Sequence, residues 1–316
     1  MSVGGPMSFV HVALALVLAP FLLSVINRTK AAYGGRRGQP WFQPYYDLWR
    51  LLRKGAVYSR TTTWVFRAGP IVGLAAVVTA LLMLPFGRTP AVIAFPGDFI
   101  LFVYLLGIAR LFLVLAALDT GSAFEGMGAN REVLYSALAE PAVMLGLAAL
   151  AKQVIDPAKA ASLLSLSSLH DQMTWDVWTN AGLVVPLVVV AWWVVLLAET
   201  SRVPVDDPTT HLELTMIHEV MVLDHSGPDF AYITYTAALK LWLFGALVLG
   251  LLFPLGVGVP WLDTLIGVGA MLVLAAAVGV VEATIARLKL PRVPELLIGA
   301  TALAALAFVL EQGGTR

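Results

Sequence analysis

The sequence predicts an all-α, polytopic membrane protein with about eight transmembrane helices. Hydrophobic residues make up 59% of the chain and charged residues only 13%, whereas an average soluble domain carries about 25% charged residues. The mean hydropathy is +0.85. Apolar runs close to the roughly 20 residues that cross a bilayer recur along the whole chain, which favours a single membrane domain over residues 1–316. The expected spans are residues 9–26, 68–86, 99–118, 133–150, 180–198, 231–253, 262–281 and 294–310.

The first span follows a segment without basic residues, so we interpret it as a retained helix and not as a secretory signal peptide. Basic residues then set the orientation, because lysine and arginine gather in cytoplasmic loops. The loop of residues 27–67 holds nine of them, the other loops expected on the same side add five, and the opposite side has only four. The sequence therefore predicts a multi-pass membrane protein with the basic loops in the cytoplasm and both termini outside.

The basic loop of residues 27–67 contains the segment QPYYDLWRLLRK, which begins at Gln43. Its apolar residues recur at helical spacing with Arg50, Arg53 and Lys54 between them, which is typical of an amphipathic helix lying in the membrane interface. An alternative stays open, in which the segment is a basic anchor that only sets topology.

Several charged residues fall within or beside the expected spans. Arg110 is deep in the third span, where a central charge costs at least about 2.5 kcal/mol, so it needs a carboxylate partner, and Glu140 is the candidate. Lys240 in the sixth span can lose its proton when buried and could relay protons. The carboxylates Glu125, Glu132, Glu140, Glu199 and Glu282 either line a hydrated ion path or are ordinary helix-end charges; their number favours the path.

The densest cluster of ionisable groups is the acidic cytoplasmic loop, residues 199–230. It contains Arg202, three of the five histidines, and seven carboxylates: Glu199, Asp206, Asp207, Glu213, Glu219, Asp224 and Asp229. Ionisable groups this close to a bilayer are usually functional. We therefore assign an ion-path or coupling role to Glu199, Arg202, Asp206, Glu213, Glu219 and Asp224.

A cytoplasmic helix is predicted across residues 207–227, because Asp207-Pro208 resembles a helix start and Gly227-Pro228 a stop. On such a helix His211, His218 and His225 recur every seven residues and form one stripe. Successive histidines would lie roughly 10 Å apart, which is too far to share one metal ion. We therefore expect no metal site, and expect Asp207 and the three histidines to contact a partner subunit.

Other functional classes find no support in the sequence. The net charge is zero and there are no cysteines, so nothing draws the chain to nucleic acid and no cysteine-ligated cluster can form within it. Hydrolase, ATPase, metalloprotease and dinucleotide-binding motifs are absent. If the protein serves redox chemistry, its redox cofactors are expected in partner subunits and not in this chain.

The acidic loop resembles a known family. Glu199-Thr200-Ser201-Arg202, Pro204, Asp206, Pro208 and Glu213-Leu214 are similar to the signature of subunit 1 (the H subunit) of respiratory complex I. The resemblance extends to Gln43-Pro44-Tyr45, Gly121-Ser122, residues 128–131 and Glu140. Val205, Asp207, Thr209 and His211 depart from that signature, and about three residues are inserted before Ser226-Gly227. In these features the chain is closest to the membrane subunits of group 4 nickel–iron hydrogenases, the formate hydrogenlyase type.

This resemblance implies a non-catalytic heel subunit that docks a soluble arm and couples electron transfer to proton or sodium translocation. The implied partners are hydrogenase-like small and large subunits, which would carry iron–sulfur clusters, together with antiporter-like membrane subunits. Whether the soluble partners also carry a nickel–iron centre stays open. The resemblance also implies a prokaryotic cytoplasmic (inner) membrane. The departures at Val205 to His211 leave quinone binding open. One alternative is therefore the quinone-binding subunit of a complex I-type NADH dehydrogenase, and another is a self-contained secondary transporter, although no repeated halves are evident.

Overall fold

The computed structural model describes residues 2–154, 165–207, 216–252 and 256–313. The long helices are α1 (Pro6–Tyr33), α3 (Trp64–Leu82), α4 (Asp98–Asp119), α5 (Ala123–Val154), α9 (Val184–Glu199), α10 (Gly227–Leu252), α11 (Pro260–Thr284) and α12 (Val293–Gly313). Shorter elements are α2 (Gln43–Leu52), α7 (Leu166–Gln172), α8 (Trp175–Asn180) and the 3₁₀ helices η2 (Glu219–Val222) and η3 (Leu290–Arg292). The strands β1 (Ser2–Val3) and β2 (Ile93–Ala94) pair antiparallel, with Ser2 opposite Ala94.

The fold is all-α and polytopic, as the sequence predicts. Among the described residues, seven helices are long and apolar enough to cross a membrane, and α9 is a shorter apolar helix. At about 1.5 Å per residue, the 16 residues of α9 extend about 24 Å, somewhat less than the roughly 30 Å of a bilayer core. Helices suit this environment because their backbone polar groups are paired within the segment.

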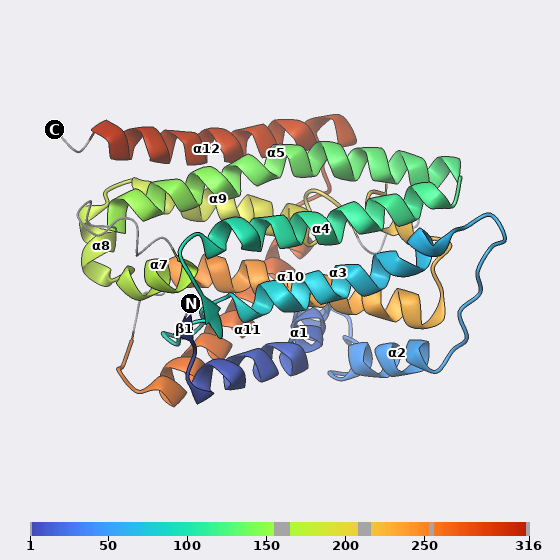
Figure 1. Ribbon diagram of the computed structural model, residues 1–316, viewed down its shortest axis with the longest axis horizontal. Helices are drawn as coiled ribbons and strands as arrows, with labels where there is room; N and C mark the ends of the chain where they lie inside the picture. Colours follow the sequence, from blue (N-terminus) through green and yellow to red (C-terminus); the bar gives the residue numbers. More distant parts are fainter. Residues whose placement is uncertain (1, 155–164, 208–215, 253–255, 314–316) are drawn as a thin grey trace.

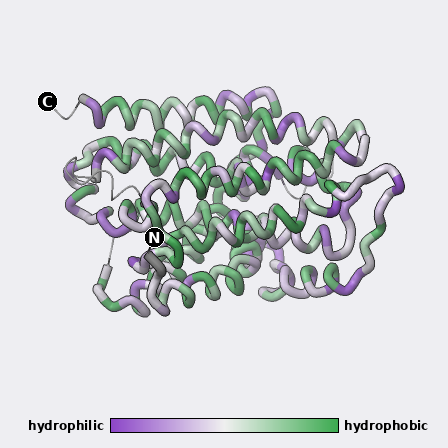
Figure 2. The backbone as a smooth tube through the Cα atoms, viewed as in Figure 1, coloured by the Kyte–Doolittle hydropathy of each residue, from purple (hydrophilic) through white to green (hydrophobic). Residues whose placement is uncertain are grey.

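The long helices run side by side, so the connections gather at two ends of the bundle (Figure 1). Both chain termini, α7 and α8 lie at one end. The opposite end, called here the loop end, holds α2, the α4–α5 turn and residues 200–207, 216–226 and 285–292. Hydrophobic residues dominate the helices between the two ends (Figure 2). Among the spans, α10 is the most enclosed, with 67% of its most apolar window buried.

A proline in α1 frees one of two adjacent carbonyls that hold neighbouring helices. Pro20 has no N–H and so leaves the carbonyl four residues earlier without its helical partner. That carbonyl, on Leu16, accepts a hydrogen bond from the Tyr235 hydroxyl of α10 at 2.7 Å. The adjacent carbonyl of Val17 accepts one from the Tyr45 hydroxyl of α2 at 2.5 Å. The interrupted helix is thus the place where α2 and α10 are attached to α1.

The fourth span begins earlier than its hydropathy indicates. Only three residues separate α4 from α5, with Gly121 at φ 71°, a left-handed conformation that favours glycine. Glu125 and Glu132 therefore lie on α5 itself and not in a preceding loop. They share this helix with Glu140. Of the three, Glu132 and Glu140 lie within reach of Arg110 on α4.

The predicted helix over residues 207–227 is wrong in its described part. Residues 216–226 contain only the single turn η2, and Gly227-Pro228 begins α10 where the sequence suggested a stop. Gly227 has φ 56°, and a Cβ there would lie 2.7 Å from the Gly55 carbonyl oxygen. This tight approach of two backbones, which local sequence patterns do not reveal, sets the start of α10. His211 and Glu213 lie outside the described residues.

Candidate functional site

Arg110 is the centre of a buried polar cluster within the bundle. Its side chain, on α4, is 8% exposed and contacts three carboxylates. Nη1 donates to Glu140 of α5 and Nη2 to Glu199 at the end of α9, while Nε lies 3.4 Å from Glu132 Oε1. The expected Arg110–Glu140 pair is therefore present, and Glu132 and Glu199 complete the set. A second cation approaches from α10, where Lys240 Nζ is 3.7 Å from Glu199 Oε2.

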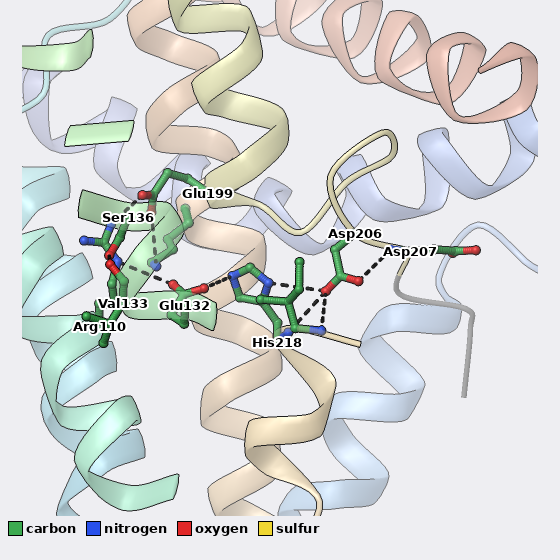
Figure 3. A network of polar contacts seen from close by, with 10 residues as sticks. Arg110, Glu132, Val133, Ser136, Glu199, Asp206, Asp207 and His218 are labelled. Atoms are coloured by element: carbon green, nitrogen blue, oxygen red, sulfur yellow. Dashed lines mark hydrogen bonds and ion pairs between the residues drawn. The ribbon is translucent and has the colours of Figure 1, made fainter. Parts of the chain in front are cut away.

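His218 extends this cluster toward the loop end. Its Nε2 lies 3.0 Å from Glu132 Oε2, and its Nδ1 lies 3.5 Å from Asp206 Oδ2. Asp206 in turn pairs with Arg287 Nη2 at 2.9 Å. Figure 3 shows this row of side chains, which runs from Arg110 and Glu199 through Glu132 and His218 to Asp206. One continuous series of ion pairs thus connects α4 with the acidic loop.

Asp206 also fixes the backbone of the loop. Its carboxylate accepts hydrogen bonds from the backbone N–H groups of Asp207, Ile217 and His218, at 2.9, 3.2 and 3.1 Å. Arg131 of α5 donates to the Met216 carbonyl at 2.7 Å. The segment that carries His218 is therefore bound on both sides, and the position of the imidazole depends on these contacts.

The charges in this series balance when His218 is protonated. The described members are four carboxylates and four cations, namely Glu132, Glu140, Glu199 and Asp206 with Arg110, His218, Lys240 and Arg287. Burial opposes protonation of His218, but Glu132 and Asp206 outweigh it and raise the pKa of the imidazole to about 10. Burial likewise disfavours ionisation of Asp206, yet His218 and Arg287 hold the pKa of that carboxyl below its usual range.

A separate ion-pair group lies beside the first. Glu282 of α11 contacts Arg202 Nη1 at 3.2 Å and Lys30 Nζ of α1 at 2.8 Å. The Glu282 side chain is fully buried. This group ties the Glu199–Arg202 motif to α1 and α11, so Arg202 and Glu282 hold the motif in place next to the Arg110 cluster.

The remaining predicted site residues are placed differently. Glu125 is buried on α5 and accepts a hydrogen bond from the Asp224 backbone N–H at 3.1 Å. Asp224 is exposed, whereas Asp207 and Glu219 are half-buried at the loop end. Asp229 is buried in the first turn of α10.

The histidine stripe predicted for partner contact is wrong in its described part, because His218 and His225 are not on a common helix. His225 is buried and stacks on Phe66 with ring centroids 4.0 Å apart. Burial lowers the pKa of His225 to about 4, so this ring is neutral at neutral pH. His218, in contrast, contacts two carboxylates of the same chain, those of Glu132 and Asp206. Among the described residues, no group of three or more histidine, aspartate or glutamate side chains is arranged to hold a metal ion.

A cavity of about 230 Å³ opens beside the cluster. Glu199, Arg202, His218 and Lys240 form its charged part, while α1, α3, α4 and α10 supply apolar walls. The apolar lining includes Leu23, Pro70, Leu113, Phe230 and Ile233. The space is therefore amphipathic, with ionisable groups facing an apolar chamber.

Sequence reasoning missed three residues of the site. Arg287 and Lys30 entered only as charges that set topology, and Arg131 only as such a charge and as part of the family resemblance. In the structure they bind Asp206, Glu282 and the Met216 carbonyl, respectively. Their signal in the sequence is proximity to the ends of membrane spans that also carry acidic residues. That signal does not say which ends pack together.

Comparison with known proteins gives a consistent set of relatives. The family model described as NADH dehydrogenase matches residues 7–311. The chain is 31% identical over 311 residues to formate hydrogenlyase subunit 4 of Escherichia coli (strain K12), covering 93% of this chain and 95% of that protein. It is 29% identical over 244 residues to hydrogenase-4 component C of the same organism, covering 76% and 73%.

A solved structure shows the same fold. A chain in the structure of the membrane-bound sulfane sulfur reductase, an archaeal respiratory membrane complex, superposes with a TM-score of 0.77 at 23% identity. The match covers 96% of this chain and 98% of the other. The arrangement of helices described above is therefore shared by that chain.

Proposed function

Because the chain belongs to the NADH dehydrogenase family, as its resemblance to complex I subunit 1 predicts, we propose that it couples electron transfer to ion movement as a membrane-anchor subunit. It is a membrane subunit of a respiratory complex of the complex I-like or group 4 hydrogenase type. Within that description, we infer that it docks a soluble hydrogenase-like arm and connects it to ion-translocating membrane subunits.

The observation that carries this proposal is the row of ion pairs from Asp206 to Glu140. Asp206 and His218 lie at the loop end, where a soluble subunit would dock, and Glu132, Arg110 and Glu140 lead into the bundle. Ion pairs in a site of low dielectric respond strongly to a change in any one charge. A displacement of the loop by the docked arm would therefore alter the proton affinity of the buried carboxylates.

Glu140 is the member of the row that faces outward. Its side chain is 44% exposed, although α5 is a membrane span. A carboxylate facing lipid near the bilayer centre costs about 2.5 kcal/mol or more, so a polar surface must cover it in the assembled complex. We assign that surface to an antiporter-like membrane subunit, into which the ion path would continue.

A single-cysteine experiment tests this placement, because the chain has no cysteine of its own. Ala137 lies one turn before Glu140 on α5 and is exposed. Ala137→Cys, labelled with a photo-crosslinker in the intact complex, is expected to link to another membrane subunit. Crosslinks to lipid alone would remove the support for a path through Glu140.

The identity of the complex is tested by purification. The proposal assigns iron–sulfur clusters and a nickel–iron centre to the soluble partners and none to this chain. The purified complex is then expected to contain iron and nickel and to evolve hydrogen. Nickel-free complex without hydrogen evolution would exclude the hydrogenase type and leave the coarser complex I-like assignment.

The cavity supports a second candidate function, in which the subunit binds quinone. Its apolar walls suit a hydrophobic ring and tail, and Lys240, Arg202 and His218 could donate hydrogen bonds to a carbonyl. If this candidate holds, the complex is expected to reduce a soluble quinone analogue. Pro70→Trp or Ile233→Trp, in the cavity wall, should then lower the rate of that reduction. If neither variant nor the analogue changes the rate of hydrogen evolution, the first candidate function, the membrane anchor of a hydrogenase-like arm, is favoured.

A further inference from the structure

Helix α2 presents an exposed aromatic stripe. Phe42, Tyr46, Trp49 and Arg53 follow one another at intervals of four, three and four residues, so they share one side of the helix. Phe42, Tyr46 and Trp49 are 58%, 63% and 63% exposed. None of the ten residues of α2, all of which the structure describes, is buried. Figure 1 shows the helix outside the bundle at the loop end.

The stripe is bordered by an excess of positive charge. Residues 27–67 contain nine basic residues and a single acidic one, Asp47. Asp47 lies 3.7 Å from Arg50, whose side chain is 69% exposed. Arg53 and Lys54 are exposed and form no ion pair within the described part of the chain. The Arg53 guanidinium lies 6.0 Å from the centre of the Trp49 ring, so cation and ring occupy the same surface.

The helix is held firmly against the membrane-spanning part of the molecule. Tyr45 donates to the Val17 carbonyl of α1, and Ser24 of α1 donates to the Trp41 carbonyl at 2.6 Å. Phe21 of α1 stacks on Trp41 with centroids 5.7 Å apart. Phe42, at the start of the stripe, also lies beside Phe21, with ring centroids 6.3 Å apart. Tyr46 and Trp49 are left exposed at the end of a membrane bundle.

We propose that α2 is a binding site for anionic phospholipid. The headgroup phosphates contact Arg50, Arg53 and Lys54, and the rings of Phe42, Tyr46 and Trp49 enter the interfacial layer beneath them. Tyrosine and tryptophan concentrate at this level of the bilayer because each has an apolar ring and a polar tip. Basic residues on an interfacial helix add attraction to anionic headgroups.

A lipid fits this surface better than a free phosphate does. Binding of a free anion would not account for the three exposed rings, and insertion of the rings into a neutral membrane would not account for the adjacent cations. An anionic phospholipid satisfies both features at once, because its phosphate and its acyl chains are joined. Each cation near an anionic membrane surface strengthens binding by about fivefold.

The test uses the intact complex reconstituted in nanodiscs of phosphatidylcholine mixed with phosphatidylglycerol. After detergent extraction, mass spectrometry gives the ratio of the two lipids that remain bound. Arg53→Gln with Lys54→Gln is expected to lower the bound phosphatidylglycerol, while Arg36→Gln with Arg37→Gln is the matched control. The control removes the same charge from the same loop, at exposed positions that precede α2 and do not border the stripe.

Three further results decide the proposal. Equal retention of phosphatidylglycerol in the two double variants would overturn it. Displacement of the retained lipid by inorganic phosphate would also overturn it, because the site would then bind the anion alone. Loss of soluble subunits from the Arg53/Lys54 variant in pure phosphatidylcholine nanodiscs would show that α2 docks a protein instead. Retention of those subunits, with lower phosphatidylglycerol, supports the lipid site.

Discussion

His218 Nε2 lies 3.0 Å from Glu132 Oε2, and this contact joins the acidic loop to the buried Arg110 cluster. The imidazole belongs to the loop end, whereas Glu132 belongs to a membrane span. Asp206 holds the other side of the ring. Any movement of residues 216–218 therefore changes the environment of a carboxylate inside the bundle.

The charge of His218 makes the stability of the protein depend on pH. Its folded-state pKa is raised to about 10, above the ordinary value of about 6.5. The stabilisation is therefore fully present below about pH 6.5 and is lost as the pH rises through about 10. We expect the difference in melting temperature between wild type and His218→Gln to shrink over this range. A difference that stays constant from pH 6 to pH 10 would contradict a charged His218.

Removing the central guanidinium is expected to be severe. Arg110→Ala leaves Glu132, Glu140 and Glu199 without their shared cation, and breaking a buried ion pair in this way costs about 3–5 kcal/mol. Arg110→Lys keeps the charge but cannot contact three carboxylates in the same fork geometry. Folded yield after detergent extraction should fall in the order wild type, Arg110→Lys, Arg110→Ala. Equal yield of Arg110→Ala and an exposed control, Arg60→Ala, would show that the cluster contributes little to folding.

Two glycines of α5 offer a matched test of loop position. A Cβ at Gly128 would lie 2.4 Å from Val220 Cγ1 and 3.0 Å from the Ile217 carbonyl oxygen, whereas at Gly126 the nearest atom is 4.0 Å away. Gly128→Ala should displace the His218 segment and destabilise the protein by about 1–3 kcal/mol. Gly126→Ala should be neutral or mildly stabilising, because alanine favours helix. Similar melting temperatures for the two variants would mean that the loop is not packed closely on α5.

Docking of the soluble arm is best tested at Asp224. Asp206 is only 2% exposed and takes part in the buried row, so reversing its charge would disturb folding and docking together. Asp224 is exposed at the loop end, beside the exposed Leu223. Asp224→Lys is expected to reduce co-purification of the soluble subunits, since reversed charge opposes a complementary partner surface. Asp176→Lys, exposed at the opposite end, is the control; equal recovery with both would move the docking surface elsewhere.

Hydropathy predicted most of the fold, because each span must be apolar over the thickness of a bilayer. The need of a buried arginine for a counterion likewise predicted the Arg110–Glu140 pair. Both successes follow from a constraint that acts on one residue or one helix. The coupling role that the family resemblance implies for Glu199, Arg202 and Asp206 stays a prediction.

The failures concern contacts between distant segments. The seven-residue spacing of His211, His218 and His225 is compatible with a helix, but the described loop is set by Asp206, Arg131 and the close approach at Gly128. Nothing in the spacing shows that His218 faces Glu132, which is 86 positions earlier in the chain. The same holds for Arg287 and Asp206. Which span ends meet depends on helix packing, and a single sequence does not report it.

The most direct test of the coupling account is the number of ions moved per electron pair by the complex in proteoliposomes. His218→Gln removes the charge that joins Asp206 to Glu132, and His225→Gln applies the same substitution to a neutral histidine outside the row. The account predicts that His218→Gln keeps electron transfer but moves severalfold fewer ions per electron pair, while His225→Gln keeps the wild-type ratio. A wild-type ratio in His218→Gln would contradict it.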